Sequence, residues 1–495
     1  MTMHTPMSAP NVTAPDDAVL DALRAVVGPE HVLTTATHDL TAWEQDWRRR
    51  HRGRARAVVR PADTAQVAAV VRACAAHGAP IVPQGGNTGL VLGGVPDASG
   101  TEVVLSLQRL QRIRALDRDN LTLTVEAGCV LQAAQQAAAD AGLWLPLSLA
   151  SEGSCTVGGV LATNAGGTQV LRFGNARDLC LGLEVVTADG RVWDGLRGLR
   201  KDNTGYDLRH LFIGSEGTLG VITAAVLKLV PQPAAQLTAW AAVPSLAAAV
   251  ALLGVAQRHL GPGLTGFEVM NRLALQLVRR HFPALPQPLT EQDAPYAVLL
   301  ELSDPEGETH ARAQLEASLT HALQEGCALD AVVASSVAQA RTLWHIRECI
   351  PLAQAEEGLN IKHDISLPVS RIPAFCAQAE VELQRHAPGA RLVNFGHLGD
   401  GNLHFNVQCP EGADAAAFLR AHEAAINTLV YDLVRAHGGS ISAEHGIGRL
   451  KAATLPRYQD PVALALMRAI KQALDPHHRL NPGRVLADGQ APTAP

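Results

Sequence analysis

The sequence predicts an α+β protein of more than one domain, and three observations lead to this fold class. The chain has 495 residues, which is too long for one hydrophobic core, so two or three domains are expected. Apolar residues make up 47% and charged residues 18%, a balance typical of globular proteins with a large core. From residue 57 onward, short apolar runs typical of strands alternate with segments of helical periodicity. Together these features predict domains that combine helices with strands.

Charge and cysteine content exclude several classes of partner. The formal net charge of −6 is small for this length, so neither nucleic acid nor an anionic membrane surface is expected, and 4% aromatic residues argue against a base-stacking platform. Eight cysteines occur without CxxC pairs, which predicts buried free thiols in a reducing compartment. The first residues lack the pattern of a signal peptide, and no apolar run is long enough for a membrane span. We therefore expect a cytoplasmic protein.

The N-terminal part is predicted to be an arm, a helix and a basic loop. Residues 1–16 are polar and contain prolines, and residues 17–27 have the spacing of a short amphipathic helix. A cluster of arginines follows, consisting of Arg48, Arg49, Arg50, Arg52, Arg54 and Arg56. This cluster is either a solvated loop or an anion site for a substrate or for the phosphates of a cofactor.

The next segment predicts strand, helix and strand before a glycine-rich loop. Residues 57–61 form a short β run, and an Asp/Thr start signal precedes the helical spacing of residues 64–77. In PIVPQGGNTGLVLGG (residues 80–94), five glycines directly follow a strand, so the backbone can approach a phosphate closely. The spacing is neither GxGxxG nor GxxxxGK[ST], so nicotinamide or nucleotide triphosphate binding does not follow. A glycine-rich hairpin is the alternative.

Further strands, helices and two more glycine-containing segments complete the first half. Strands are predicted at residues 101–107, 121–127 and 181–187, and a helix at 130–141. LPLSLASEGSCTVGGVLATNAGG (residues 145–167) contains a helix start at 155–162 whose N-terminus could receive an anion. FIGSEGTLGVITAAVLKLVP (residues 212–231) predicts a turn before a strand that ends at Leu229.

The middle of the chain is predicted to be a separate α+β domain. Residues 231–244 are rich in proline and alanine and are interpreted as the linker. The predicted helices cover residues 247–259, 271–281, 309–325 and 335–350, with a proline-rich loop at 283–295 and a strand at 296–302. A last helix is predicted at residues 460–474.

Two histidines in NFGHLGDGNLHFNV (residues 394–407) are the strongest local sign of chemistry. Asp-Gly and Asn between apolar runs predict two strands joined by a tight turn, which could bring His397 and His404 to the same end of the hairpin. ISAEHGIGR (residues 441–449) adds Glu444 and His445. Two His and one Glu are the ligand set of an open catalytic zinc site. The alternative is an ordinary hairpin with a surface histidine pair.

The ordered motifs resemble a known flavoprotein family. PQGGNTGLVLGG, SEGSCTVGGVLATNAGG and GSEGTLGVIT resemble the PCMH-type FAD-binding domain of the vanillyl-alcohol oxidase superfamily. WHIRE, IKHDISLP, GHLGDGNLHFNV, SAEHGIGRLK and LNPGRVL resemble its D-2-hydroxyacid dehydrogenase branch, which includes D-2-hydroxyglutarate dehydrogenase, D-lactate dehydrogenase and the glycolate oxidase flavin subunit. The resemblance implies an arm and helix (1–40), a PCMH-type FAD-binding domain of two α/β subdomains (41–231), a substrate or cap α+β domain (232–440), a C-terminal helical return segment completing the active site (441–487) and a tail (488–495).

The resemblance also implies how FAD is held. Pro83, Gly85, Gly86, Asn87, Thr88 and Gly89 would wrap the pyrophosphate. Ser151, Gly153, Thr156, Gly159, Asn164 and Gly166 would line the flavin and phosphates. Glu216, Gly220 and Ile222 would hold the ribose and adenine side, with Asn481 near the isoalloxazine. Relatives with covalent flavin place His or Cys at the first loop, where this chain has Asn87 and Thr88, so non-covalent FAD is expected.

By the same resemblance, the substrate is a D-2-hydroxy acid. Arg347 and Lys362 would bind its carboxylate, with Asn406 as a further hydrogen-bond donor. His397, His404 and Glu444 would hold a divalent metal, expected to be Zn²⁺, at the substrate oxygens, and His445 would accept the hydroxyl proton. Relatives acting on hydroxyglutarate can carry Thr four residues after the Arg, where this chain has Pro351, so a shorter or different D-acid stays open.

The expected activity is FAD-dependent oxidation of a D-2-hydroxy acid, D-2-hydroxyglutarate or a D-lactate-like acid, to the 2-oxo acid by hydride transfer to flavin N5. Electrons would pass to an electron-transferring flavoprotein, a quinone or a cytochrome, and a homodimer is one option for assembly. The alternatives are a glycolate oxidase-type flavin subunit, an oxidase that uses O₂, a non-catalytic flavin-binding partner, and a purely structural metal in the hairpin.

Overall fold

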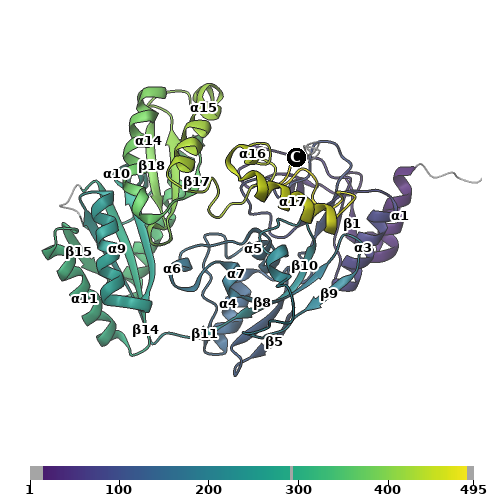
Figure 1. Ribbon diagram of the computed structural model, residues 1–495, viewed down its shortest axis with the longest axis horizontal. Coiled ribbons are helices and arrows are strands. Elements are labelled where there is room, and N and C mark those ends of the chain that lie inside the picture. The colour runs from purple at the N-terminus through teal and green to yellow at the C-terminus, as the bar shows by residue number, and fades with distance from the viewer. Residues whose placement is uncertain (1–14, 290–293, 488–495) are drawn as a thin grey trace, which may run out of the picture.

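The computed structural model describes residues 15–289 and 294–487, which form two halves side by side (Figure 1). We call residues 15–231 the N-terminal half and residues 235–440 the cap half. Each half contains both sheets and helices, which agrees with the predicted α+β class. The domain limits given above stay predictions.

The first sheet of the N-terminal half is small and mainly parallel. In spatial order its strands are β1 (Val32–Leu33), β2 (Ala57–Val59), β4 (Val103–Ser106) and β3 (Ile81–Gln84). The predicted helix after β2 is α3 (Thr64–Ala76), and α1 (Pro15–Val27) packs against it; a short helix, α2 (Thr41–Glu44), lies before β2. The Asp63 side chain accepts a hydrogen bond from the Gln66 backbone N–H, an N-cap that typically stabilises a helix by about 1 kcal/mol.

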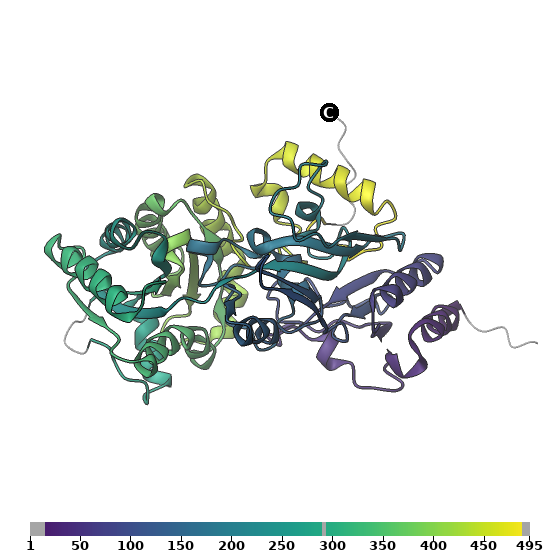
Figure 2. The same cartoon turned by 90° about the horizontal axis from the view of Figure 1, so that it is seen from below.

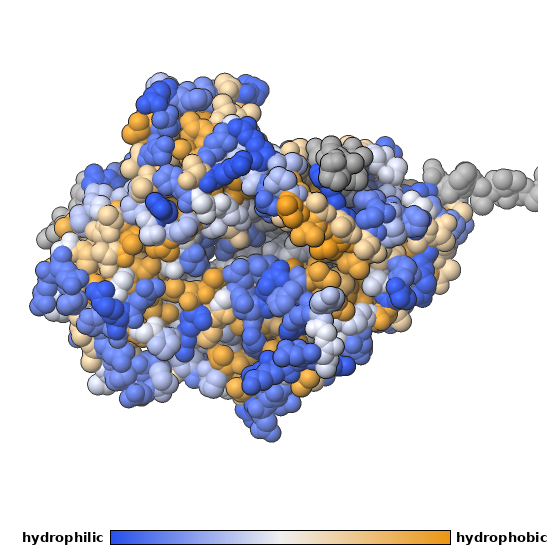
Figure 3. Space-filling view, viewed as in Figure 1, coloured by the Kyte–Doolittle hydropathy of each residue, from blue (hydrophilic) through white to orange (hydrophobic). Residues whose placement is uncertain are grey.

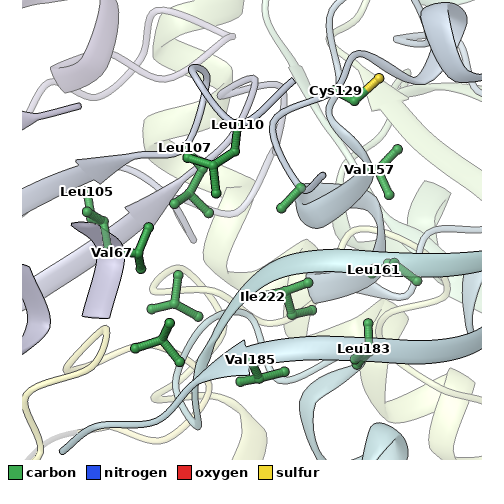
Figure 4. Packing of buried hydrophobic residues seen from close by; sticks show 14 of the residues in the cluster. Val67, Leu105, Leu107, Leu110, Cys129, Val157, Leu161, Leu183, Val185 and Ile222 are labelled. Carbon is green, nitrogen blue, oxygen red and sulfur yellow. The ribbon is translucent and has the colours of Figure 1, made fainter. Parts of the chain in front are cut away.

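The second sheet of this half is antiparallel. In spatial order its strands are β5 (Ile113–Asp117), β6 (Thr122–Glu126), β10 (Val221–Lys228), β8 (Cys180–Val186) and β9 (Val192–Gly195). Its helices are α4 (Leu131–Asp140), α5 (Val157–Thr163), α6 (Val170–Phe173), α7 (Ala176–Leu179) and α8 (Arg209–Phe212), and β7 (Leu143–Trp144) pairs with β11 (Val230–Pro231). One hydrophobic core joins both sheets, and Figure 4 shows Val157 and Leu161 of α5 near Leu183 and Ile222 of the second sheet.

The cap half is built on one antiparallel sheet. Its strands, in spatial order, are β15 (Asp330–Val333), β12 (Ala235–Val243), β14 (Tyr296–Asp304), β13 (Leu264–Asn271), β18 (Arg391–Gly396), β19 (Asn402–Gln408) and β16 (Asn360–Ile361), with β17 (Asp364–Ser366) also paired to β19. One face packs on α9 (Leu246–Leu260), α11 (Glu308–Gln324), α14 (Ile372–His386) and α15 (Ala415–Ala436). The other packs on α10 (Arg272–His281), α12 (Val337–Glu348) and α13 (Ile350–Glu357).

The predicted linker is wrong in its conformation. Most of the segment from 231 to 244 is β12, which pairs with β14 along its whole length and with β15 on its other side. Its alanines resemble a linker in composition, but seven of the nine residues are buried because the strand lies inside the sheet. The strand β13, whose buried residues include Phe267 and Glu268, was not predicted from the sequence.

The C-terminal segment leaves the cap half, and α17 (Pro461–Leu474) lies against the N-terminal half (Figures 1 and 2), where Lys471 donates a hydrogen bond to the Thr218 carbonyl oxygen. The short helix α16 (Leu455–Tyr458) still contacts α15 of the cap half, through Arg457 and Tyr458 with Asp432. Leu480 bridges to Ile81 of β3 and belongs to the core of the N-terminal half. In the described ranges 15–289 and 294–487, no helix combines the length and apolar character needed to cross a bilayer.

Candidate active site

The candidate site lies at the edge of the cap sheet that faces the N-terminal half, and Figure 3 shows a hollow between the two halves. Phe395 of β18 pairs with His404 of β19, which pairs with Asp364 of β17, so these side chains share one face of the sheet. The two strands of the predicted hairpin are β18 and β19, with a short turn at 398–400 between them. His397 stands at the start of this turn, and its ring centre lies 5.7 Å from that of His404.

All three predicted metal ligands come together in the fold. Ligand atoms of His397, His404 and Glu444 all lie within 4.8 Å of one another, and Glu444 Oε1 is 3.7 Å from His397 Nε2. A second group of this kind, Asp364, His404 and His445, shares His404. Two imidazoles and a carboxylate fit a divalent metal of the zinc type and leave a coordination position for a substrate oxygen. That the cluster binds a metal stays a prediction.

A buried carboxylate on β13, Glu268, joins a predicted metal ligand to the predicted substrate arginine. Its Oε1 is 2.6 Å from His397 Nδ1. Its Oε2 accepts a hydrogen bond from Nε of Arg347 at 2.8 Å and lies 2.7 Å from Nη2 of the same guanidinium in an ion pair. Burial alone would raise the pKa of Glu268, but His397 and Arg347 outweigh it and hold this pKa at about 2. The bond to Nδ1 leaves Nε2 of His397 facing Glu444, the orientation that a metal ligand needs.

Asp364 positions the loop that carries Glu444 and His445. Its Oδ2 accepts hydrogen bonds from the backbone N–H groups of both residues, at 2.9 and 2.8 Å, and lies 3.7 Å from His445 Nδ1. Burial would raise the pKa of Asp364, but His445 and His404 hold it well below its usual range. Residues 441–447 form no strand, so Glu444 and His445 can both face the site. In a strand, neighbouring residues point to opposite faces of the sheet, but this limit does not apply to a loop.

The second glycine-rich segment touches this cluster directly. The backbone N–H of Gly167 donates a hydrogen bond to Glu444 Oε1. A Cβ atom on Gly166 would lie 2.8 Å from the same oxygen and 3.1 Å from Val170, so the carboxylate needs glycine at this point. The contact places the segment that the sequence assigns to the flavin against the predicted metal ligands, although the two are far apart in the chain.

The first two glycine-rich segments meet and form a cradle that fits a dinucleotide diphosphate. A Cβ atom on Gly85 would lie 2.2 Å from Thr156 Oγ1, and one on Gly86 would lie 2.1 Å from the Ser154 carbonyl oxygen. Within the described residues, the backbone N–H groups of 85–89 have no hydrogen-bond acceptor, and the buried Thr156 Oγ1 has no partner. Free donors with no side-chain bulk are what a diphosphate requires. Pro83, Asn87, Thr88, Gly89, Ser151, Gly153 and Gly159 lie in these two segments.

The third group of predicted cofactor residues has other contacts in the fold. The buried Glu216 carboxylate accepts the backbone N–H groups of Ile447 and Gly448, at 2.7 and 2.8 Å, and so joins the N-terminal half to the C-terminal segment. Asn481 Nδ2 donates to the carbonyl oxygens of Gly93 and Glu216, at 2.9 and 2.7 Å, which brings it beside the first glycine-rich segment. Ile222 and the neighbours of Gly220 pack in the core, and Asn164 is the left-handed C-cap of α5. Their contact with FAD stays a prediction.

The predicted substrate residues share one side of the cap sheet but differ in availability. Glu268 engages Arg347 through two nitrogens, and the Arg347 guanidinium stacks 4.8 Å above the Phe395 ring. Asn406 donates to Gln354 Oε1 at 3.0 Å and accepts the backbone N–H of His363, so both ends of its amide are used within the protein. Lys362 forms no ion pair with the residues that the structure describes.

Sequence reasoning missed Glu268 and Asp364. Glu268 is an acidic residue inside the apolar strand pattern GFEVM, and a charge in such a strand is a sign of a functional partner. Asp364 lies in HDIS, which is mostly polar and gives no comparable signal of burial. Neither sequence segment reveals its partners, because these lie on other elements.

Comparisons with known proteins agree with this geometry. A family model described as "FAD binding domain" matches residues 55–195, and one described as "FAD linked oxidases, C-terminal domain" matches residues 232–485. The chain is 39% identical to D-2-hydroxyglutarate dehydrogenase of Xanthomonas citri pv. viticola over 97% of this chain and 98% of that protein. It is also 39% identical to the mitochondrial D-2-hydroxyglutarate dehydrogenase of Bos taurus, over 96% and 84%. The structure of p-cresol methylhydroxylase with substrate bound has a TM-score of 0.74 at 17% identity, covers 97% of this chain and 99% of that one, and shares the fold.

Proposed function

The chain belongs to the FAD-linked oxidase family, with D-2-hydroxyglutarate dehydrogenases among its relatives, and we propose that it oxidises a D-2-hydroxy acid to the 2-oxo acid with the help of a divalent metal. It is an FAD-linked oxidoreductase that acts on a CH–OH donor. The substrate is D-2-hydroxyglutarate or a shorter acid of the D-lactate type. The contact between Glu444 and Gly167 carries the proposal, because it brings the predicted metal ligands against the predicted flavin segment.

The chain supplies positioned groups for each part of such a reaction. When bound, FAD accepts a hydride from C2 of the substrate, and the metal lowers the pKa of its hydroxyl group. His397, His404 and Glu444 would hold the metal, and Arg347 and Lys362 would bind carboxylate oxygens. His445 accepts the hydroxyl proton at its ring, and Asp364 keeps that ring in place through the 3.7 Å contact with Nδ1 and the bond to the His445 backbone.

Glu268 has a positioning role in this proposal. It fixes the ring of His397 by accepting a hydrogen bond from Nδ1, and it fixes the guanidinium of Arg347 by one hydrogen bond and an ion pair. Because Glu268 contacts both His397 and Arg347, it keeps the proposed metal ligand and the proposed substrate-binding arginine at a constant separation. The electron acceptor would be an electron-transferring flavoprotein, a quinone or a cytochrome.

Anaerobic mixing of the purified flavoprotein with D- and L-2-hydroxy acids tests the reaction. The visible flavin band should bleach with D-acids and stay unchanged with L-acids. A chelator should abolish bleaching while the FAD stays bound, and Zn²⁺ should restore it. A colourless protein, or bleaching that survives complete metal removal, would contradict the proposal in its flavin part or in its metal part, respectively.

A further inference from the structure

The segment that carries Glu444 and His445 has no regular structure of its own. Residues 441–448 form neither helix nor strand, and we call them the 441–448 loop. Backbone N–H groups of a partly buried loop need acceptors from outside it, because no ladder of neighbouring backbone groups is present. In this loop four of them donate to side-chain carboxylates, those of Asp364 and Glu216. The position of Glu444 and His445 therefore depends on these two acids.

The two carboxylates come from opposite halves of the molecule. Asp364 of β17, in the cap half, holds the middle of the loop by two N–H groups, as described above. Glu216, in the N-terminal half, accepts the N–H of Ile447 through Oε1 at 2.7 Å and that of Gly448 through Oε2 at 2.8 Å. The loop is thus held from both sides where the chain passes from α15 to the C-terminal segment (Figure 1).

Glu216 is fixed in a conformation that few residues other than glycine adopt. Its φ is +53°, in the left-handed region, which costs free energy and persists only where the surroundings hold it. Its backbone N–H donates to the Ala162 carbonyl oxygen at 2.8 Å, and its carbonyl oxygen accepts from Asn481 Nδ2 at 2.7 Å. A Cβ atom on Gly446 would lie 2.6 Å from Glu216 Oε1, so the loop needs glycine where it passes the carboxylate. The strained backbone thus directs a buried carboxylate toward the loop.

A buried cation, Lys451, accompanies the two carboxylates. Its Nζ donates a hydrogen bond to the carbonyl oxygen of Ile441, the first residue of the loop, at 2.7 Å. Burial lowers the pKa of Lys451, whereas attraction to Asp364 and Glu216 opposes this change. Burial also raises the pKa of Glu216, and the two loop N–H groups and Lys451 oppose this rise. Lys451 therefore holds the start of the loop and offsets part of the negative charge that holds its middle and its end.

We propose that Glu216 is a positioning residue for the reaction and sets the place of the 441–448 loop, with Lys451 as its counter-ion. The inference rests on the proposed function, in which Glu444 binds the metal and His445 accepts the proton. Glu216 touches neither substrate nor metal in this proposal and acts through the backbone N–H groups of the loop. The affinity of the site for its metal then depends on a carboxylate of the N-terminal half that is not a ligand.

Hydrogen exchange of the FAD-loaded protein tests the contact without turnover. Glu216→Gln keeps the size of the side chain but replaces one acceptor oxygen by an NH₂ group, so one of the two loop N–H groups loses its acceptor. Peptides that cover residues 441–451 should exchange about tenfold faster or more, the usual effect of losing a hydrogen bond to a charged group. Glu126→Gln is the matched control and should leave loop exchange unchanged, because the buried Glu126 of the same half accepts the backbone N–H of Arg112 instead, at 2.9 Å.

Zinc affinity is the second readout, measured by competition with a zinc-binding dye. Glu216→Gln should weaken zinc binding by about tenfold or more, because a shifted loop misplaces Glu444, while the FAD content stays the same. Excess Zn²⁺ should then restore the rate of anaerobic flavin reduction by a D-2-hydroxy acid, whereas a rate lost for another reason would not respond. Lys451→Met should change both readouts in the same direction, and it decides the question if Glu216→Gln does not fold. Glu126→Gln should bind zinc normally.

The two readouts together separate the outcomes. Loop exchange equal to that of the unmodified protein, or faster exchange with unchanged zinc affinity, overturns the inference. Loss of FAD from Glu216→Gln with normal loop exchange also overturns it and assigns the carboxylate to the cofactor. If the unmodified protein binds no zinc, the metal part of the proposed function fails, and the exchange measurement still decides whether Glu216 holds the loop.

Discussion

The two halves of the molecule contribute different kinds of chemical group to the candidate site. The N-terminal half offers backbone N–H groups and glycines, and it excludes side chains from the cradle between Gly85 and Thr156. The cap half instead places ionisable side chains on a sheet face, each held by a partner from another element, as in the set of Glu268, His397 and Arg347. The comparison teaches that ligand binding at the first site should depend on side-chain volume, whereas ligand binding at the second should depend on side-chain charge. The following predictions test this difference.

The largest effect is expected at the charged site, from replacing His445. His445→Asn should lower the rate of anaerobic flavin reduction by a D-acid by about 10²–10⁴-fold, because it removes the proposed base. The FAD content, measured from absorbance after gel filtration, should stay the same because His445 lies outside the segments predicted to bind FAD. His478→Asn, at an exposed histidine, is the control. A normal rate in the His445 variant would remove the base from the mechanism.

The pH dependence of stability should reveal a buried histidine of the cap half. Burial lowers the pKa of His363 to about 4, against the smaller opposing effect of its hydrogen bond to the Phe405 carbonyl. Because the folded pKa lies below the unfolded one, the unfolded state binds the extra proton as pH falls from about 6.5 to 4, and stability is lost by about 3 kcal/mol over this window.

Urea unfolding from pH 7 to 4 measures this loss. His363→Phe cannot titrate and should flatten the pH dependence by that amount, whatever its stability at pH 7. His386→Phe, at an exposed site, should keep the slope of the unmodified protein. An identical slope in the His363 variant would assign the acid sensitivity to other groups.

Glu268→Gln should lower the affinity for the proposed metal by about 10–100-fold, the usual effect of mutating the hydrogen-bond partner of a metal-ligating histidine, because the amide removes the negative charge that faces His397. Competition with a zinc-binding dye measures this affinity without turnover. Glu301→Gln is the matched control, because Glu301 is a buried carboxylate of the same sheet whose partners are Thr265, Trp344 and Gln169. Equal zinc affinity in both variants would restrict Glu268 to a structural role.

The smallest effect should come from adding one methyl group to the uncharged site. Gly86→Ala brings a Cβ atom against the Ser154 carbonyl oxygen, and we expect FAD binding to weaken by about 1–3 kcal/mol, the typical cost of overpacking. Fluorescence titration of the apoprotein with FAD measures the change. Gly254→Ala, in the helix α9, should bind FAD normally. Unchanged affinity at position 86 would show that volume does not limit the cradle.

Local patterns in the sequence determined a large part of this description. The N-cap at Asp63, the turn between His397 and His404, and the helix start at Asp460 depend on residues a few positions apart, and these features were predicted correctly. The glycine-rich segments were likewise recognisable, because a backbone that must be free of side chains requires glycine, and glycine is visible in the sequence. The alanine-rich strand β12 was misread, because its position inside a sheet depends on partners far away in the chain.

The tertiary structure alone decided which charges meet. Glu268 reaches Arg347 across 79 positions and His397 across 129, and Asp364 holds the backbone of His445 across 81. Arg48 approaches Asn360 across 312. A sequence gives the identity of each ionisable residue but does not show locally which distant residue it will contact. That pairing depends on the order of the strands and on how the loops close. The sequence therefore determined the chemical groups of this protein, and the fold decided which of them lie together.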